Sequence, residues 1–260
     1  MFETCVISSG SANCIIVCSD QASILLDAGT TLEQTIGAFA TLNIDRSSLR
    51  AIVVSHEHED HIRGVGAISR ALRLPVLITK KTHSVCSQDI GYLGDRLIYF
   101  EQNVPIVIDD IHIHPYASYH DAVESSNFCF RHMKQLSRKL GVVTDLGKPL
   151  EQTVEMLTNC TTIVLESFYD DDLLNGSEVD LEFKTLLRNN QIHLSNKQAV
   201  DLVKRIIHPE LKNIILAHIS LDLNRPDLAT QAMKSYLDSI QSRISLSFAD
   251  TYSVPHFIDV

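Results

Sequence analysis

The sequence has no apolar run near the length of about 20 residues that a membrane-spanning helix needs. Its first residues, MFETCVISSGSANC, also lack the basic segment and the following apolar segment of a secretory signal. The six cysteines include no C-x-x-C pair, so we interpret them as reduced and mostly buried thiols. We therefore expect a cytoplasmic protein that makes no contact with a membrane.

Basic residues are also scarce, since 22 lysines and arginines stand against 32 aspartates and glutamates, which gives a net charge of −10. This balance argues against a broad basic surface for nucleic acid. It does not exclude a nucleic-acid substrate. Part of the acidic charge lies in one run at 170–172, and bound divalent ions would add positive charge at a site.

No Pro-rich hinge or low-complexity linker divides the 260 residues. Short apolar runs typical of strands, such as 51–55 and 161–167, alternate with segments of helical spacing, such as 31–44 and 226–241. We therefore predict one α/β domain over residues 1–260, with two β-sheets and helices outside them. Polar residues gather where the apolar strands end, which is the usual place for a ligand site in such folds.

Three histidines, two glutamates and an aspartate occupy positions 56–61, directly after an apolar strand. His56 and His58 are two residues apart and would face the same side of an extended segment. Asp60 and His61 follow where the chain begins to look helical, so they would point to a neighbouring spot. This loop predicts two adjacent divalent metal ions, with Zn²⁺ preferred and Mn²⁺ or Fe²⁺ as alternatives.

The alternative interpretation of this loop is a polar turn in which Asp60 caps the next helix. That explains an aspartate alone, but not the pattern H-x-H-x-D-H after an apolar strand. Glu57 and Glu59, which alternate with the histidines, are expected to face solvent.

The pattern H-x-H-x-D-H resembles the signature of the metallo-β-lactamase superfamily. Four further segments match that superfamily in order: SILLDAG with Asp27, PYASYHDAV with His120, GVVTDLG with Asp145 and IILAHIS with His218. Together these segments extend over nearly the whole chain. The resemblance implies a four-layer αβ/βα sandwich of two mixed β-sheets with outer helices, and a metal-dependent hydrolase.

The resemblance also implies how the metal ligands divide. One ion would be held by His56, His58 and His120, and the second by Asp60, His61 and His218, with Asp145 bridging both. The two ions would share a hydroxide that acts as the nucleophile, and Asp60 would orient it. Asp27 would hydrogen-bond the ligand loop from behind. Its alternative interpretation is a simple turn residue.

Within the superfamily the chain is similar to the bacterial YycJ (WalJ) group, through SHEHEDHIRGV, YHDAVE, VVTDLG, VLES, IHLSN and LAHIS. Members of that group are regarded as metal-dependent nucleases acting on DNA ends, which implies a DNA exonuclease. The chain departs from the group at Ile192, where Gly is usual, and at Phe168 and Tyr169, where Asn-His is usual. We expect these departures to affect the choice of substrate more than metal binding.

The segment IHLSN supplies the candidate substrate residues. The resemblance favours His193 as the group that stabilises the phosphate or protonates the leaving oxygen, with Ser195 and Asn196 beside the substrate. The alternative is a helix start, with Ser195 and Asn196 as an N-cap. His112 and His114 form another H-x-H pair, but no Asp-His follows them, so we expect a surface hairpin there.

Two other functions stay open. A small-molecule hydrolase of the same fold would cleave a thioester, a lactone or a cyclic phosphodiester, and the acidic net charge favours it. A binding or scaffold protein without chemistry would lack a metal ligand, whereas here none is missing. Lys184 and Arg188 share a helix face that could touch backbone phosphates, although a solvated face is the simpler account.

Overall fold

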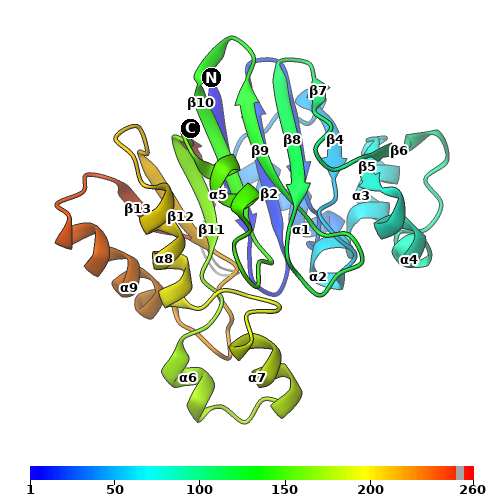
Figure 1. The fold of residues 1–260 in the computed structure, drawn as a ribbon. Helices are drawn as coiled ribbons and strands as arrows, with labels where there is room; N and C mark the ends of the chain where they lie inside the picture. Colours follow the sequence, from blue (N-terminus) through cyan, green and yellow to red (C-terminus); the bar gives the residue numbers. More distant parts are fainter. Residues whose placement is uncertain (250–254) are drawn as a thin grey trace.

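The computed structural model describes residues 1–249 and 255–260, and within them two seven-stranded β-sheets pack face to face (Figure 1). In spatial order, the first sheet comprises β14 (Ile258–Asp259), β1 (Phe2–Ser8), β2 (Cys14–Ser19), β3 (Ser23–Leu26), β4 (Leu49–Val53), β5 (Val76–Thr79) and β6 (Leu97–Phe100). The second comprises β13 (Ser245–Phe248), β12 (Asn213–Ala217), β11 (Thr162–Glu166), β10 (Gln135–Val143), β9 (Ser126–His132), β8 (Ile111–Ala117) and β7 (Ile106–Ile108).

Helices cover the outer face of each sheet. The first sheet is covered by α1 (Leu32–Thr41), α3 (Val65–Leu72) and α4 (Lys80–Ile90). The second is covered by α5 (Glu151–Leu157), α8 (Asn196–Ile206) and α9 (Pro226–Ser239). Three short helices, α2 (Glu59–Ile62), α6 (Asp171–Gly176) and α7 (Leu181–Arg188), lie at the lower edge of the sandwich in Figure 1. Two 3₁₀ turns span Arg46–Ser48 and Gly94–Arg96.

Three apolar clusters hold these layers together. The central cluster lies between the sheets and takes side chains from both, among them Phe2 and Leu26 from the first and Phe128 and Val164 from the second. The other two clusters lie between each sheet and its helices. Burial of apolar surface is the main stabilising term in such a packing. The resulting helix–sheet–sheet–helix sandwich confirms the predicted fold class.

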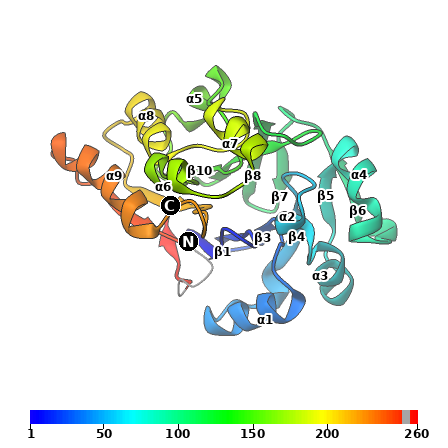
Figure 2. The ribbon, with the colours of Figure 1, turned by 90° about the horizontal axis from the view of Figure 1, so that it is seen from below.

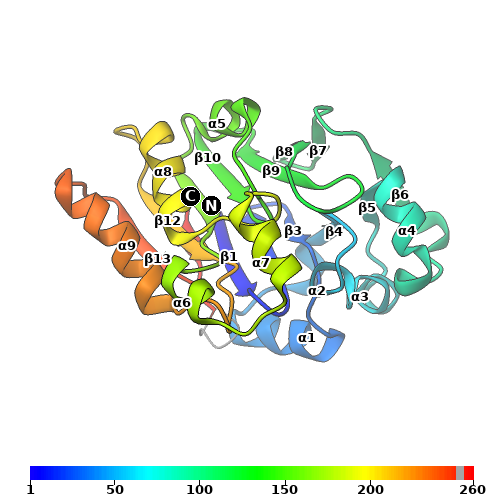
Figure 3. The ribbon, with the colours of Figure 1, turned by 60° about the horizontal axis from the view of Figure 1, so that its bottom comes forward.

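Each sheet is mixed. Strands β3 to β6 run parallel to one another, as do β10 to β13, and the remaining neighbours are antiparallel. As a result the carboxyl ends of β3, β4, β8, β10, β11 and β12 reach the edge at which α2 lies. Seen from below in Figure 2, α6 and α7 project over part of this edge, and Figure 3 shows α7 beside it.

Most predicted elements agree with the structure, although several observed elements, among them α6 and β14, have no predicted counterpart. The spacing in 31–44 predicts α1 correctly, and His112 and His114 lie in the β7–β8 hairpin, as expected. Helix α4 was not predicted, because its inward positions include Thr82 and Cys86, which give a weak apolar signal. Among the described residues, none of the helices is both long and apolar enough to cross a membrane.

Candidate metal centre

The predicted ligand loop lies at the carboxyl end of β4. His58 is the N-cap of α2, so Asp60 and His61 fall in the first turn of that helix, and the ring of His61 lies beside that of His56, with the centroids 4.2 Å apart. The backbone behind the loop is packed so closely that a Cβ on Gly29 would lie 1.7 Å from the Asp60 carbonyl oxygen. Glycine is therefore required at this approach.

Two groups of ligand atoms converge at this edge. In the first, His58 Nδ1 lies 3.2 Å from His120 Nε2, and Asp145 Oδ1 lies 3.6 Å from His120 Nε2 and 4.0 Å from His56 Nε2. The structure thus brings together the four side chains that the sequence assigned to one ion.

The second group lies on the other side of Asp145. His61 Nε2 is 3.5 Å from Asp60 Oδ2 and 3.3 Å from Asp145 Oδ2, and His218 Nε2 is 3.7 Å from Asp60 Oδ2. Asp145 therefore presents one carboxylate oxygen to each group. All seven predicted ligands, drawn from loops of both sheets, belong to sets of atoms that could hold an ion at this edge: His56, His58 and His120; His56, His61 and Asp145; and Asp60, His61 and His218.

The residues present fit divalent ions. Ligand atoms about 2.0–2.1 Å from a tetrahedral Zn²⁺ would be about 3.3 Å apart, close to the separations in both groups. His56 Nε2 and Asp145 Oδ2 are buried without a hydrogen-bond partner, an expensive arrangement unless a cation satisfies them. A further cluster of Asp145, Glu166, His193 and His218 uses nitrogens that already bond to Glu166, so we interpret it as a hydrogen-bonded group.

Buried carboxylates orient the ligand imidazoles. Asp27 accepts hydrogen bonds from Ser55 N at 2.7 Å and from His61 Nδ1 at 2.8 Å, so His61 turns Nε2 towards the ligand group. This is the position in which the sequence placed Asp27. Burial alone would lower the pKa of His61, but the charges of Asp145 and Asp27 outweigh it and raise the pKa to about 9. Binding of a cation would therefore displace a proton.

Glu166 does for the second sheet what Asp27 does for the first. Its carboxylate accepts from His218 Nδ1 at 2.9 Å, from His193 Nδ1 at 2.8 Å and from the backbone N–H of Asp145 at 2.9 Å. Burial would raise its pKa, but His193 and His218 outweigh that effect and lower the pKa to about 2. Glu166 is absent from the residues that the sequence predicts for the site, although a charged residue at the end of a buried apolar strand is a signal that could have indicated it.

Three of these side chains sit on residues with a left-handed backbone: Asp27, Asp145 and His218 have φ of 58°, 57° and 49°. Asp27 and His218 directly follow a strand and Asp145 lies two residues beyond the end of β10, so each left-handed residue turns the chain sharply at the sheet edge. Such conformations are uncommon outside glycine and cluster at functional sites.

The loop between β1 and β2 was also missed by sequence reasoning. Asn13 Nδ2 lies 2.9 Å from Asp60 Oδ2 and 3.0 Å from His61 Nε2. Ser9 Oγ accepts the backbone N–H of His218 at 2.5 Å. This loop therefore joins ligands from both sheets.

The two glutamates of the ligand loop differ from each other. Glu59 faces solvent, as expected, and pairs with Arg63. The prediction for Glu57 is wrong, because it is half-buried and accepts the backbone N–H of Val123 at 2.7 Å. It thereby ties down the loop that carries His120.

A cavity of about 300 Å³ opens over the ligands. His58, Asp60, Asp145 and His218 line it together with His193 and Phe168. His193 therefore lies where a substrate held by the ions could reach it.

The structure does not support the expected substrate contacts of Ser195 and Asn196. Ser195 is the N-cap of α8 and accepts the backbone N–H of Gln198, in a reciprocal capping box. The buried side chain of Asn196 bonds to Ser167, Asp170 and Asn224. Their polar atoms are thus used within the fold, as the helix-start alternative describes.

Two of the three departures from the YycJ group pattern also lie away from the cavity. Tyr169 and Ile192 are buried in the apolar cluster that seats α6 and α7 on the sandwich. Only Phe168 lines the cavity. In the segment of α6 and α7, Lys184 donates a hydrogen bond to Ser177 O and Arg188 donates one to Asn175 Oδ1. Both side chains therefore bond within that segment.

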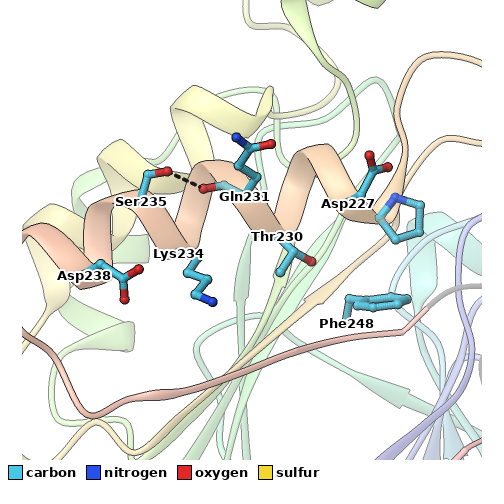
Figure 4. A pocket seen from close by; sticks show the side chains of 8 residues that line it. Asp227, Thr230, Gln231, Lys234, Ser235, Asp238 and Phe248 are labelled. Atoms are coloured by element: carbon cyan, nitrogen blue, oxygen red, sulfur yellow. Dashed lines mark hydrogen bonds between the residues drawn. The ribbon is translucent and has the colours of Figure 1, made fainter.

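A larger cavity of about 670 Å³ lies elsewhere, between α9 and Phe248 of β13 (Figure 4). Its lining includes Asp227, Lys234 and Asp238, and none of the predicted ligands is among its residues. The ligand groups described above therefore make the smaller cavity the candidate site.

Comparisons with known proteins show similarity to the metallo-β-lactamase superfamily. The sequence model of the metallo-β-lactamase superfamily matches residues 8–129. Exodeoxyribonuclease YycJ of Bacillus anthracis is 29% identical over 90% of this chain and 88% of its own length, and exodeoxyribonuclease WalJ of Streptococcus pneumoniae is 26% identical over 95% and 92%.

Among solved structures, the metallo-β-lactamase fold protein YhfI from Bacillus subtilis superposes with a TM-score of 0.75, at 15% identity and with both chains fully covered. At that identity the likeness concerns the fold alone. Taken together with the sequence matches, these findings show that the chain has the metallo-β-lactamase fold and indicate a metal-dependent hydrolase that is similar to proteins of the metallo-β-lactamase superfamily.

Proposed function

We propose that the chain is a phosphodiester hydrolase that acts on DNA ends, as an exodeoxyribonuclease. The observation that carries this proposal is the place of His193, a possible proton donor, on the wall of the cavity beside both ligand groups. A hydrolase that expels an alkoxide needs such a donor. The names of the relatives that match 90–95% of the chain support the choice of DNA.

In this proposal His56, His58 and His120 would hold one divalent ion, Asp60, His61 and His218 would hold a second, and Asp145 would contribute to both sites. When bound, the ions supply an activated water and neutralise charge on the phosphate. The many imidazoles favour Zn²⁺, with Mn²⁺ and Fe²⁺ as alternatives. The buried free thiols at all six cysteines fit the reducing cytoplasm, in which we place the activity.

The side chains then have separate tasks. Asp60, which belongs to the second ligand group and lines the cavity, orients the attacking water. Glu166 holds His193 through Nδ1, so that Nε2 is the nitrogen that gives a proton to the departing oxygen. Asp27 and Glu166 keep the ligands His61 and His218 in place.

A small-molecule hydrolase is the second candidate, because a cavity of about 300 Å³ is at the lower end of the range for ligand sites. Three consecutive aspartates at 170–172, beside the same edge, would also repel a long phosphate backbone. This function would act on a thioester, a lactone or a cyclic phosphodiester.

The test compares end-labelled single-stranded and duplex DNA with thioester, lactone and cyclic phosphodiester substrates, using protein loaded with Zn²⁺ or Mn²⁺. We expect release of nucleotides from the DNA ends. His193→Ala should keep its metal and lose about 10²–10⁴-fold in turnover. His112→Ala, a histidine of the distant hairpin, should behave as wild type. Intact DNA together with cleavage of a small substrate would overturn the DNA proposal in favour of the second candidate.

A further inference from the structure

Phe168 packs flat against the imidazole of His193. The two ring centroids are 3.8 Å apart and the planes differ by only 12°. Phe168 also contacts His218, at a centroid distance of 5.3 Å, and it lines the cavity over the metal ligands. This contact with the ring face differs from those of the carboxylates, because Asp27 holds His61, and Glu166 holds His193, only through a ring nitrogen.

Phe168, on which the His193 ring stacks, is itself held in place. The backbone N–H of Phe168 donates to Leu194 O at 2.9 Å, and the Phe168 carbonyl accepts from Ser220 N at 3.0 Å. The next residue, Tyr169, is buried in the cluster under α6 and α7. The backbone of Phe168 is thus hydrogen-bonded to the segments that contain Leu194 and Ser220, which fixes the point from which its ring extends.

One hydrogen bond does not fix an imidazole. The bond from His193 Nδ1 to Glu166 Oε2 holds one atom, and the ring can still tilt about that point. A stacked aromatic ring removes this freedom by confining the imidazole to one plane, and it adds about 0.5–1.5 kcal/mol of stacking energy to the contact. With the plane of the His193 ring and the position of its Nδ1 both fixed, the N–H bond at Nε2 can point in only one direction.

We propose that Phe168 is a positioning residue that holds His193 for protonation of the leaving group. The inference rests on the proposed phosphodiesterase function. In that step a hydroxide, formed when water has given one proton to solvent, bonds through oxygen to phosphorus, and the bond from phosphorus to the leaving oxygen breaks. The Nε2 proton of the protonated His193 ring passes to that oxygen, which leaves the ring neutral until solvent protonates it again. Phe168 therefore matters when the leaving group is a poor one, such as the alkoxide of a nucleoside.

The test uses Phe168→Leu with two substrates: thymidylyl-thymidine, which expels a nucleoside alkoxide, and thymidine 5′-(p-nitrophenyl) phosphate, which expels a stable phenolate. We expect kcat for the dinucleotide to fall about tenfold, a fraction of a full general-acid effect. KM for both substrates, and kcat for the nitrophenyl ester, should stay within about twofold of wild type. Phe183→Leu is the control, because Phe183 belongs to the same apolar cluster but does not stack on His193.

Each other kinetic outcome overturns the proposal. A rise in KM for both substrates at constant kcat would make Phe168 a binding surface for the base. An equal fall in kcat for both, matched by Phe183→Leu, would make its role purely structural. Unchanged kinetics would leave it without a role in the reaction.

A second readout does not depend on activity. In the zinc-loaded protein, at a pH at which the His193 ring is protonated, nitrogen-15 NMR should give one set of Nδ1–H and Nε2–H signals for wild type and Phe183→Leu, and averaged signals for Phe168→Leu. If the wild type cleaves no phosphodiester, the proposed function fails while this comparison still decides whether Phe168 holds the ring. Identical His193 signals in all three proteins would refute the positioning role.

Discussion

At the scale of the residue, the site depends on a few buried carboxylates that do not themselves bind metal. Glu166 accepts five N–H groups, from Asp145, Leu146, Leu194, His193 and His218. The ligands could be predicted from their sequence pattern, whereas Glu166 could not be singled out, because its partners are distant in sequence. Only the fold brings those donors to one carboxylate.

Glu166→Gln should therefore be severely destabilising. Glutamine has one acceptor oxygen, and its amide would face N–H donors, so several buried donors lose their partner. We expect a loss of about 3–5 kcal/mol in the free energy of unfolding, the usual range when one partner of a buried charged network is removed. Urea unfolding of the metal-free protein measures it. The exposed Glu59→Gln should change stability by less than about 0.5 kcal/mol, and similar values for both variants would contradict the role of Glu166.

At the scale of the element, the sheet edge that carries the candidate site consists of loops that pack against one another. Strand and helix positions with clear apolar periodicity, such as β4 and α1, could be predicted from the sequence. The contacts between loops could not, because they depend on backbone atoms that carry no sequence pattern. One case is the approach of Gly29 to the Asp60 carbonyl. Another is the capping box of Ser195, a residue that the sequence also allowed as a substrate contact.

A matched pair of glycines tests this seating. Gly29→Ala would place Cβ 1.7 Å from the Asp60 carbonyl oxygen, so the ligand loop must move. We expect lower thermal stability and weaker metal binding, measured by calorimetry of unfolding and by metal titration. Gly37→Ala, in α1, meets nothing within 4 Å and should stabilise the protein by roughly 0.5–1 kcal/mol. A Gly29→Ala protein with normal metal affinity would show that the loop is not seated in this way.

At the scale of the whole molecule, the two sheets contribute different parts of one site. The first supplies Asp27 and the ligands of the 56–61 loop, and the second supplies His120, Asp145, Glu166 and His218. Packing of the central core thus assembles the centre. The sequence could predict this convergence only through a family pattern, since periodicity identifies strands but not which strands face each other.

The buried thiols predict how stability depends on alkaline pH. Burial raises the pKa of Cys5, in β1, from 9.0 to about 12. Above pH 9 the unfolded chain releases a proton that the folded chain keeps, so this contribution to stability is complete below pH 9 and is lost as pH rises towards 12. Urea unfolding between pH 8 and 11 should show a shallower decline for Cys5→Ala than for wild type. Parallel curves would mean that Cys5 does not keep its proton.

The most direct test of the account is the metal content of the chain. After loading with Zn²⁺ and gel filtration, elemental analysis should find about two ions per wild-type chain, as expected of a dinuclear site. Asp145→Ala should lose both, because one carboxylate oxygen of Asp145 faces each ligand group. Fewer than one ion per wild-type chain, or a fully loaded Asp145→Ala protein, would contradict the account.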